Sequence, residues 1–253
     1  MMFDLQKANM TKRISAFIFD FIITLTLAVA FGTVISFITR YDSHYEACMT
    51  VISRYEKEYG ILYSIDENEY TSLSEAGKKN YEALCNAISS DNDFIYHNHC
   101  YLNLSLLIVS LGLFLGVLVV NYIIPLVLKD GKTFGKKIFG LGVMRTDHVR
   151  VTPLFIFIRT ILGKYTIEIM VPVLLAFMIY FGMIGSLGTV FILVLLTVQI
   201  ICMIVTKTNS CIHDLLAGTV VIDFPTQKIY ETREEMIAAK EKIAAEKAAN
   251  AAY

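Results

Sequence analysis

The fold is decided by residues 10–38, which read MTKRISAFIFDFIITLTLAVAFGTVISFI. At about 1.5 Å per residue, this apolar stretch is long enough to cross a bilayer as a helix. It nevertheless carries one carboxylate, Asp20, about two helical turns inside its basic end. An unpaired aspartate at bilayer depth costs about 2.5–3.5 kcal/mol, so we expect Asp20 to face other helices, where a partner or a proton neutralises it.

The polar residues of this stretch share one side of the predicted helix. Arg13 and Asp20 are seven residues apart, with Phe17 between them and Thr24 one turn beyond. A spacing of seven returns a side chain to the same face of a helix. The pattern therefore predicts a polar stripe that faces a helix bundle.

A cleaved signal peptide is the alternative for this segment. Ala28-Val29-Ala30 resembles a cleavage site that follows a basic region and an apolar region. Asp20 within the apolar region, and the apolar run that continues past Ala30, favour a retained helix instead.

Three further apolar runs predict three more membrane spans. They cover Leu102–Leu128, Ile169–Met183 and Leu187–Val205 in a chain that is 55% hydrophobic and has a mean hydropathy of +0.57. We expect an all-α membrane protein with four transmembrane helices, a helical external loop domain, short cytoplasmic interfacial segments and a cytoplasmic C-terminal helix. The corresponding segments are 1–40, 41–101, 102–128, 129–164, 165–206 and 207–253.

The distribution of charge predicts the orientation. Arg40–Tyr101 holds five basic and eleven acidic residues, whereas Lys129–Glu168 holds eight basic and three acidic ones. The positive-inside rule then places the second loop and the N-terminus, with Lys7, Lys12 and Arg13, in the cytoplasm. Because four spans are an even number, the C-terminus is expected in the cytoplasm as well. The expected location of the protein is the cell membrane. The formal net charge of the chain is only -1. This argues against a nucleic-acid-binding protein, which requires a concentrated basic face.

The external region is expected to contain two helices. Glu46–Tyr59 and Thr71–Ser89 have helical spacing, and Ser72 or Ser74 is the candidate N-cap of the second.

The oxidation state of the three cysteines in this region is open. Cys48, Cys85 and Cys100 either form one disulfide in an oxidising exterior, with one thiol left over, or remain buried thiols. His97-Asn98-His99-Cys100 has the residue types of a metal site, but adjacent ligands without a second spaced pair are a weak signal. We therefore expect no metal or cofactor.

The loop after the second span is rich in glycine and lysine. Residues 129–143 read KDGKTFGKKIFGLGV, and their spacing does not match a phosphate-binding loop. We expect a turn followed by an amphipathic segment at the membrane surface, in which apolar side chains enter the interface and Lys132, Lys136 and Lys137 meet anionic headgroups.

Two short elements are expected next. Val143–Thr152 alternates apolar and polar residues about a turn, which predicts a hairpin. Leu154–Leu162 is a helix too short to span, expected to lie along the membrane. Within it, Arg159 is either an anchor that reaches the interface or a second cation for the buried carboxylates.

The last informative stretch follows the fourth span. Asp214 is at the same membrane face as Arg13 and is its candidate partner, and the neighbouring His213 has an ordinary pKa close to neutral. A solvated loop is the alternative for both residues. Val220–Ile222 is a candidate strand alongside the hairpin, and the chain from Thr232 onward is expected to be helical.

Three separated motifs resemble those of the RDD family of bacterial membrane proteins. They are Arg13 with Asp20, the segment 131–143 that begins GKTFGK, and the segment 213–221, which reads HDLLAGTVV. The family is named for one arginine and two aspartates, which match Arg13, Asp20 and Asp214 here. The external region 41–101 is not covered by the resemblance.

The resemblance implies transport, with exchange of monovalent cations such as sodium or potassium for protons as the role usually attached to the family. Asp20 would then be the carboxylate that binds a proton or a cation, Arg13 and Asp214 would set its pKa, and His213 would relay protons. Four spans are few for alternating access, so transport would require a homodimer. The alternative is a scaffold or accessory protein whose Arg/Asp cluster is a structural ion network. We do not expect an enzyme. Membrane lipid is expected to surround the helices.

Overall fold

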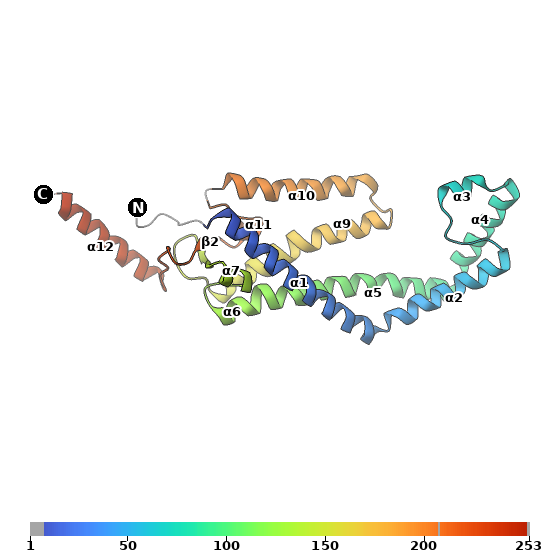
Figure 1. Cartoon of the computed structure of the whole chain (residues 1–253), viewed down its shortest axis with the longest axis horizontal. Helices are drawn as coiled ribbons and strands as arrows, with labels where there is room; N and C mark the ends of the chain where they lie inside the picture. The colour runs from blue at the N-terminus through green and yellow to red at the C-terminus, as the bar shows by residue number, and fades with distance from the viewer. Residues whose placement is uncertain (1–7, 207, 252–253) are drawn as a thin grey trace. The chain divides into compact units, whose positions relative to one another are not determined.

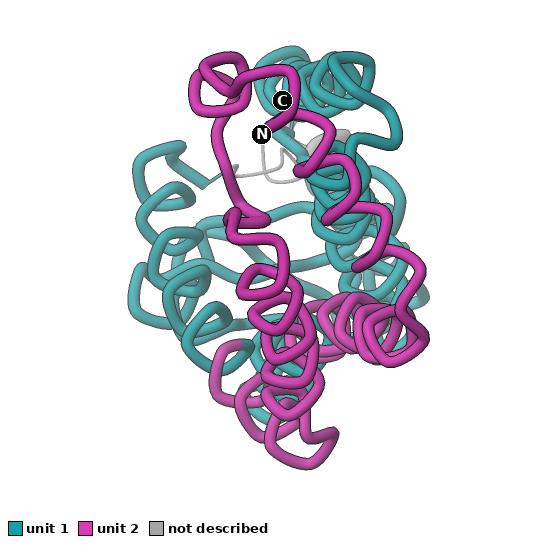
Figure 2. The backbone as a smooth tube through the Cα atoms, turned by 90° about the vertical axis from the view of Figure 1, so that its right-hand side faces the viewer, with its two compact units in different colours: residues 1–28, 113–253 teal, residues 29–112 magenta. Residues whose placement is uncertain are grey.

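The computed structural model describes residues 8–206 and 208–251 (Figure 1). It is mostly helical, and four helices are long and apolar enough to cross a membrane: Met10–Thr39, Asn92–Leu128, Pro153–Tyr180 and Gly185–Val205. The predicted fold class is confirmed. The chain divides into two compact units, Val29–Gly112 and the remainder, Met1–Ala28 with Leu113–Tyr253 (Figure 2).

The larger unit contains most of the membrane helices. Its elements are the first half of α1 (Met10–Thr39), the end of α5 (Asn92–Val117), η1 (Leu118–Ile123), α6 (Ile124–Leu128), α7 (Phe134–Ile138), β1 (Leu141–Arg145), α8 (Pro153–Phe157), η2 (Ile158–Met170), α9 (Val171–Tyr180), α10 (Gly185–Val205), α11 (Ile212–Leu216), β2 (Thr219–Asp223) and α12 (Arg233–Ala251). Two of them, η1 and η2, are π-helical stretches within the second and third spans.

The third span differs from the prediction. Residues 153–180 form one helical run of 28 residues, so the prediction that Leu154–Leu162 is a separate interfacial helix was wrong. Pro153 occupies the first turn, where the missing N–H has no cost. The polar residues Lys164 and Glu168 do not end the helix because each has a partner inside the unit: Asn121 Oδ1 lies 2.6 Å from Lys164 Nζ, and His213 Nδ1 lies 2.8 Å from Glu168.

A two-stranded antiparallel sheet lies within this unit. β1 pairs with β2 in the register Leu141↔Asp223 to Arg145↔Thr219, which confirms a strand at Val220–Ile222. The predicted hairpin is reduced to a single bridge, Met144↔Arg150. Both strands are buried almost throughout, and Val143 and Val221 pack with Ala16 of α1. The sheet therefore holds the loops around it against the start of α1.

The smaller unit contains the helical loop domain. Its helices are the second half of α1, α2 (Tyr41–Tyr59), α3 (Glu67–Ser72), α4 (Glu75–Ser90) and most of α5. The two predicted helices are α2 and α4, and Ser74 is the N-cap of α4, accepting from the N–H of Gly77 at 3.2 Å.

Within the smaller unit, the second span begins ten residues before the predicted Leu102, at Asn92, because Asp91 caps its polar first turn by accepting from the N–H of Phe94. Cys48, Cys85 and Cys100 are thiols, so the disulfide alternative is not the arrangement found.

A buried charge cluster as candidate functional site

A cavity of about 440 Å³ lies within the larger unit. It is bordered by α1, α7, the third span and α11, and charged side chains gather around it. They are Arg13, Asp20, Lys136, Arg159, Lys164, Glu168, His213 and Asp214. Sequence reasoning named six of these eight residues. Charged groups held inside a membrane protein are expensive and mark sites of function or of structural pairing.

Asp20 is held by the loop that follows the second span. Its carboxylate is 3% exposed and accepts a short hydrogen bond from the Thr133 hydroxyl and another, of 2.8 Å, from the N–H of Gly135. Thr133 is the N-cap of α7, and its hydroxyl accepts from the N–H of Lys136 while the N–H of Gly135 is left to donate to the carboxylate. A Cβ at Gly135 would overlap the carbonyl oxygen of Ala16. Glycine is thus required for α7 to approach α1 closely.

Lys136 does not lie where the sequence predicted. Its side chain is only 13% exposed, and Nζ lies 3.9 Å from Asp20 Oδ2 and 3.3 Å from the Thr133 hydroxyl. The expectation that Lys136 meets lipid headgroups was wrong, because packing of Gly135 on α1 turns the next side chain inward. Lys132 also has partners within the unit, Asp130 at 3.1 Å and the ring of Phe224.

Lys137 is the exposed member of the three. Contact of Lys137 with anionic headgroups stays a prediction.

Asp214 is the centre of a second group. Its side chain is fully buried, with Arg159 2.8 Å from Oδ1 and Arg13 3.5 Å from Oδ2. Thr219 donates a further hydrogen bond of 3.2 Å. The predicted pairing of Arg13 with Asp214 is present, and Arg159 is the second cation and not an interfacial anchor. Burial alone would raise the pKa of Asp214, but the nearby positive charges, that of Arg159 above all, hold it at about 2.

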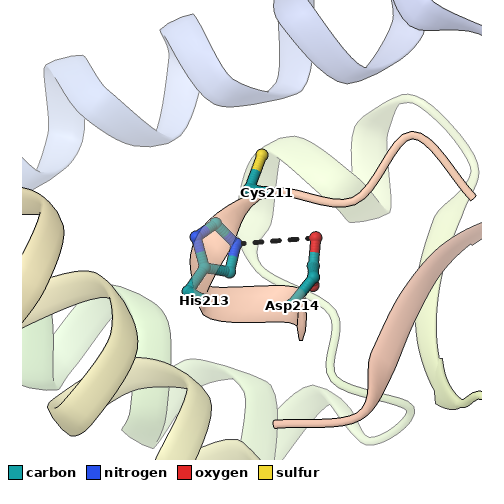
Figure 3. A group of neighbouring side chains, drawn as sticks. All are labelled: Cys211, His213 and Asp214. Carbon is teal, nitrogen blue, oxygen red and sulfur yellow. Dashed lines mark ion pairs between the residues drawn. The ribbon is translucent and has the colours of Figure 1, made fainter. Parts of the chain in front are cut away.

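His213 links this group to the membrane helices. Its Nδ1 lies 2.8 Å from the carboxylate of Glu168, and its Nε2 lies 3.1 Å from Arg159. The same Nε2 lies 3.7 Å from Asp214 Oδ2, the contact drawn in Figure 3. Burial lowers the pKa of His213 in spite of the two carboxylates nearby. The imidazole is therefore neutral at neutral pH, with Nδ1 donating to Glu168 and Nε2 accepting from Arg159.

Arg13 and Asp20 share the cavity but have different partners. Arg13 contacts Asp214 and the carbonyl of Thr208 at 3.2 Å, whereas Asp20 contacts the loop at α7. Their common face, predicted from the spacing of seven, is present. Asp20 and Asp214 are consequently the centres of two groups of side chains, and the charges of both carboxylates act on Lys136.

Sequence reasoning gave no role to Lys164 and Glu168. Their spacing of four places them on one face of a helix, which was the available signal. Gln199 of α10 also contacts Glu168, since its side-chain amide donates to the carboxylate at 3.1 Å. Gly163 lets the third span approach α11 closely, since a Cβ at this position would lie 2.6 Å from the Cβ of His213.

Cys211, His213 and Asp214 offer ligand atoms within 4.8 Å of one another. Their chemistry does not fit a metal ion. Burial, with the nearby carboxylates, raises the pKa of Cys211 to about 11, so the thiol stays protonated. The carboxylate of Asp214 is already shared by two guanidinium groups, which would repel a divalent cation.

Comparison with protein families gives a match to the RDD family model over residues 7–218. The chain belongs to the RDD family. The arginine and two aspartates of this RDD protein all border the cavity: Asp20 contacts the loop at α7, and Arg13 pairs with Asp214. Neither the curated proteins nor the solved structures contain a match to the chain.

Proposed function

We propose that this RDD protein is a secondary transporter that exchanges a monovalent cation, sodium or potassium, for a proton, with the cavity as its binding site and Asp20 as the ligand carboxylate. The observation that carries the proposal is the cavity itself, about 440 Å³ in volume and bordered by Asp20. A purely structural set of ion pairs needs no open volume, because interiors are close-packed. A transported ion needs a space next to a carboxylate.

Lys136 supplies the competing charge in this mechanism. Its ammonium lies 3.9 Å from Asp20, and burial together with the positive charges of Arg159 and Lys164 lowers its pKa to about 7, although Asp20 and Asp214 act in the opposite direction. Below that pH the ammonium neutralises Asp20. Above it, the neutral amine leaves Asp20, with the Thr133 hydroxyl beside it, available to a monovalent cation.

The charge of the cavity is the same in both states. With Lys136 protonated and His213 neutral, four cationic and three anionic side chains border the cavity. When Lys136 loses its proton and one monovalent cation binds, the total is unchanged. The proposal therefore implies one proton released for each cation bound, since a mismatch of charge in a buried site is costly.

His213 is the proposed proton relay. Its neutral imidazole contacts Glu168 through Nδ1 and approaches Asp214 through Nε2, so it can accept a proton on one nitrogen and release one from the other. Because four spans are few for alternating access, the proposal includes a homodimer. Crosslinking in the native membrane tests it: a species of twice the chain mass is expected, and a purely monomeric protein contradicts it.

Cation flux in proteoliposomes tests the proposal. With an imposed pH gradient, uptake of sodium or potassium should exceed that of empty vesicles and should fall by at least about tenfold in Asp20→Asn, because the amide cannot replace a carboxylate as a charge partner. Lys137→Met is the matched control, since Lys137 is exposed beside Lys136. Wild-type protein without flux, or Asp20→Asn with full flux, would overturn the proposal.

A scaffold role is the second candidate, and one observation favours it: each cavity carboxylate already has protein partners. Asp20 accepts from Thr133 and Gly135, and Asp214 pairs with two guanidinium groups. Under this alternative, the wild-type protein shows no flux and Asp20→Asn loses thermal stability and assembly. Size-exclusion chromatography and thermal unfolding of both proteins separate the two candidates.

A further inference from the structure

Asn121 of η1 presents a buried amide group to the cavity. The residue is 7% exposed, and its Oδ1 accepts a hydrogen bond of 2.6 Å from Lys164 Nζ. Because an ammonium has donors and no acceptor, this contact fixes which end of the amide is Nδ2. Among the described residues, Nδ2 is buried and has no hydrogen-bond partner. A buried donor without an acceptor is costly, which favours a ligand that accepts from it.

Lys164 of η2 borders the same cavity and has no ion pair with any carboxylate of the described residues. Each of the other three cationic side chains there lies 2.8–3.9 Å from Asp20 or Asp214. The ammonium of Lys164 instead contacts the amide of Asn121 and lies 5.9 Å from the ring centroid of Phe17. It is inside the third span, where an unpaired charge is expensive.

Glu168 does not supply the missing negative charge. It follows Lys164 by four residues, but its carboxylate accepts from His213 Nδ1 at 2.8 Å and from the amide of Gln199 at 3.1 Å. With Lys136 protonated, four cationic and three anionic side chains border the cavity, so their charges sum to +1. One monovalent anion would bring this sum to zero.

Two events would remove the cost of an unpaired ammonium: loss of its proton, or binding of an anion beside it. Loss of the proton leaves one polar atom of the Asn121 amide without a partner, whereas an anion accepts from the amide and the ammonium together. Nδ2 lies close to the ammonium, because Oδ1 and Nδ2 are bonded to one carbon. The anion therefore explains both observations.

A second donor is present on the turn of η2 that contacts Asn121. The hydroxyl of Thr160 donates to the carbonyl of Asn121 at 2.8 Å. Arg159, the residue before it, borders the cavity, and its Nε is buried without a hydrogen-bond partner in the part of the chain that the structure describes. Positive charge and unused donors thus gather on this side of the cavity.

We propose that Asn121 and Lys164 form a binding site for a small monovalent anion of the halide class, with Arg159 adding positive charge nearby. A halide accepts from several N–H donors at once and carries the single charge that the sum of +1 requires, whereas sulfate exceeds it. The cavity of about 440 Å³ has room for the ion. The proposal goes beyond cation exchange and does not require it, because the sum is +1 before any cation replaces the proton of Lys136.

Binding of radioactive chloride to the purified full-length protein in detergent tests this site. Sodium gluconate keeps the sodium concentration and the ionic strength constant while chloride is varied. We expect saturable binding of one chloride ion per chain, which bromide displaces. Lys164→Met should weaken binding by at least about tenfold, because it removes a charged donor from a buried site.

Asn121→Asp separates loss of the site from loss of the fold. It places a carboxylate of nearly the same size beside Lys164, which should pair with the ammonium and replace the anion. We expect this variant to remain folded in size-exclusion chromatography and to lose chloride binding by at least about tenfold. Chloride in place of gluconate should raise the unfolding temperature of the wild type and leave that of Asn121→Asp unchanged.

Asn103→Asp is the matched control, since it makes the same change at an exposed position of the second span. It should bind chloride as the wild type does. Wild-type protein without saturable chloride binding, Asn121→Asp with wild-type affinity, or equal loss in Asn103→Asp would overturn the proposal. Chloride binding is measured without a cation gradient, so a protein that binds chloride without cation flux would refute transport alone, and flux without chloride binding would refute the anion site alone.

Discussion

Lys136 and Asp20 show what a single residue contributes in this protein. The ammonium lies 3.9 Å from the carboxylate and the pKa of Lys136 is lowered to about 7 by burial. A lysine with a lowered pKa gives up its proton as the pH rises through that value. Cation uptake by the wild type should therefore rise with pH, with its midpoint near pH 7.

Lys136→Arg should abolish uptake at every pH from about 6 to 9, because a guanidinium keeps its charge up to about pH 12 and continues to neutralise Asp20. Lys136→Met should retain cation binding and lose its dependence on pH. Initial rates of uptake against pH measure both effects. A pH profile in Lys136→Met identical to that of the wild type would remove Lys136 from the mechanism.

Asp214 illustrates the cost of breaking a buried pair. Arg159→Gln should destabilise the protein by about 3–5 kcal/mol, because it leaves Asp214 with weaker compensation in a buried position. The double variant Arg159→Gln/Asp214→Asn should lose less free energy of unfolding than the two single variants lose when their losses are added. Thermal unfolding of the four proteins gives the coupling energy. Strict additivity would show that the two side chains do not stabilise each other.

The pH dependence of this pair follows from the lowered pKa. Asp214 has a pKa of about 2 when folded, below its ordinary value of about 3.9. Its stabilising contribution is therefore complete above that ordinary value and is lost as the pH falls toward 2. Unfolding measured between pH 7 and 5 should show no contribution from titration of Asp214. A wild-type stability loss in that range that Asp214→Asn lacks would contradict this assignment.

The short helix α7 shows how one element depends on one glycine. Gly135→Ala should push α7 away from α1 and release Asp20 from the N–H at position 135, because the added Cβ overlaps the carbonyl of Ala16. Loss of cation uptake together with a lower unfolding temperature is expected. Gly32→Ala is the control, since its Cβ would meet Ile108 at an ordinary 3.5 Å. Equal behaviour of the two variants would show that close packing at Gly135 is not required.

The elements also show where sequence reasoning succeeds. The four apolar runs, and Ser74 as one of two candidate N-caps, were predicted because hydropathy and capping are local properties. The length of the third span was missed because Lys164 and Glu168 are tolerated only through tertiary partners, Asn121 and His213. Lys136 was misplaced for the same reason: its direction depends on packing of α7 against α1. Local patterns identify elements, whereas buried charges are positioned by contacts distant in sequence.

At the scale of the whole molecule, the charge asymmetry of the loops predicts both termini in the cytoplasm. A protease added outside intact cells should cleave the loop domain within 41–101 and leave an epitope tag after residue 253 intact. Permeabilised cells, in which the tag becomes accessible, are the control. Cleavage of the tag in intact cells would reverse the proposed orientation.

The central claim is that a cation and the proton of Lys136 compete for Asp20, and proton release measures this most directly. Sodium or potassium added to the purified protein in weakly buffered detergent near pH 7 should release about one proton per bound cation, as the charge balance of the cavity requires. The same release is expected from Lys137→Met and none from Lys136→Met. Cation binding without proton release in the wild type, or no cation binding at all, would contradict the account.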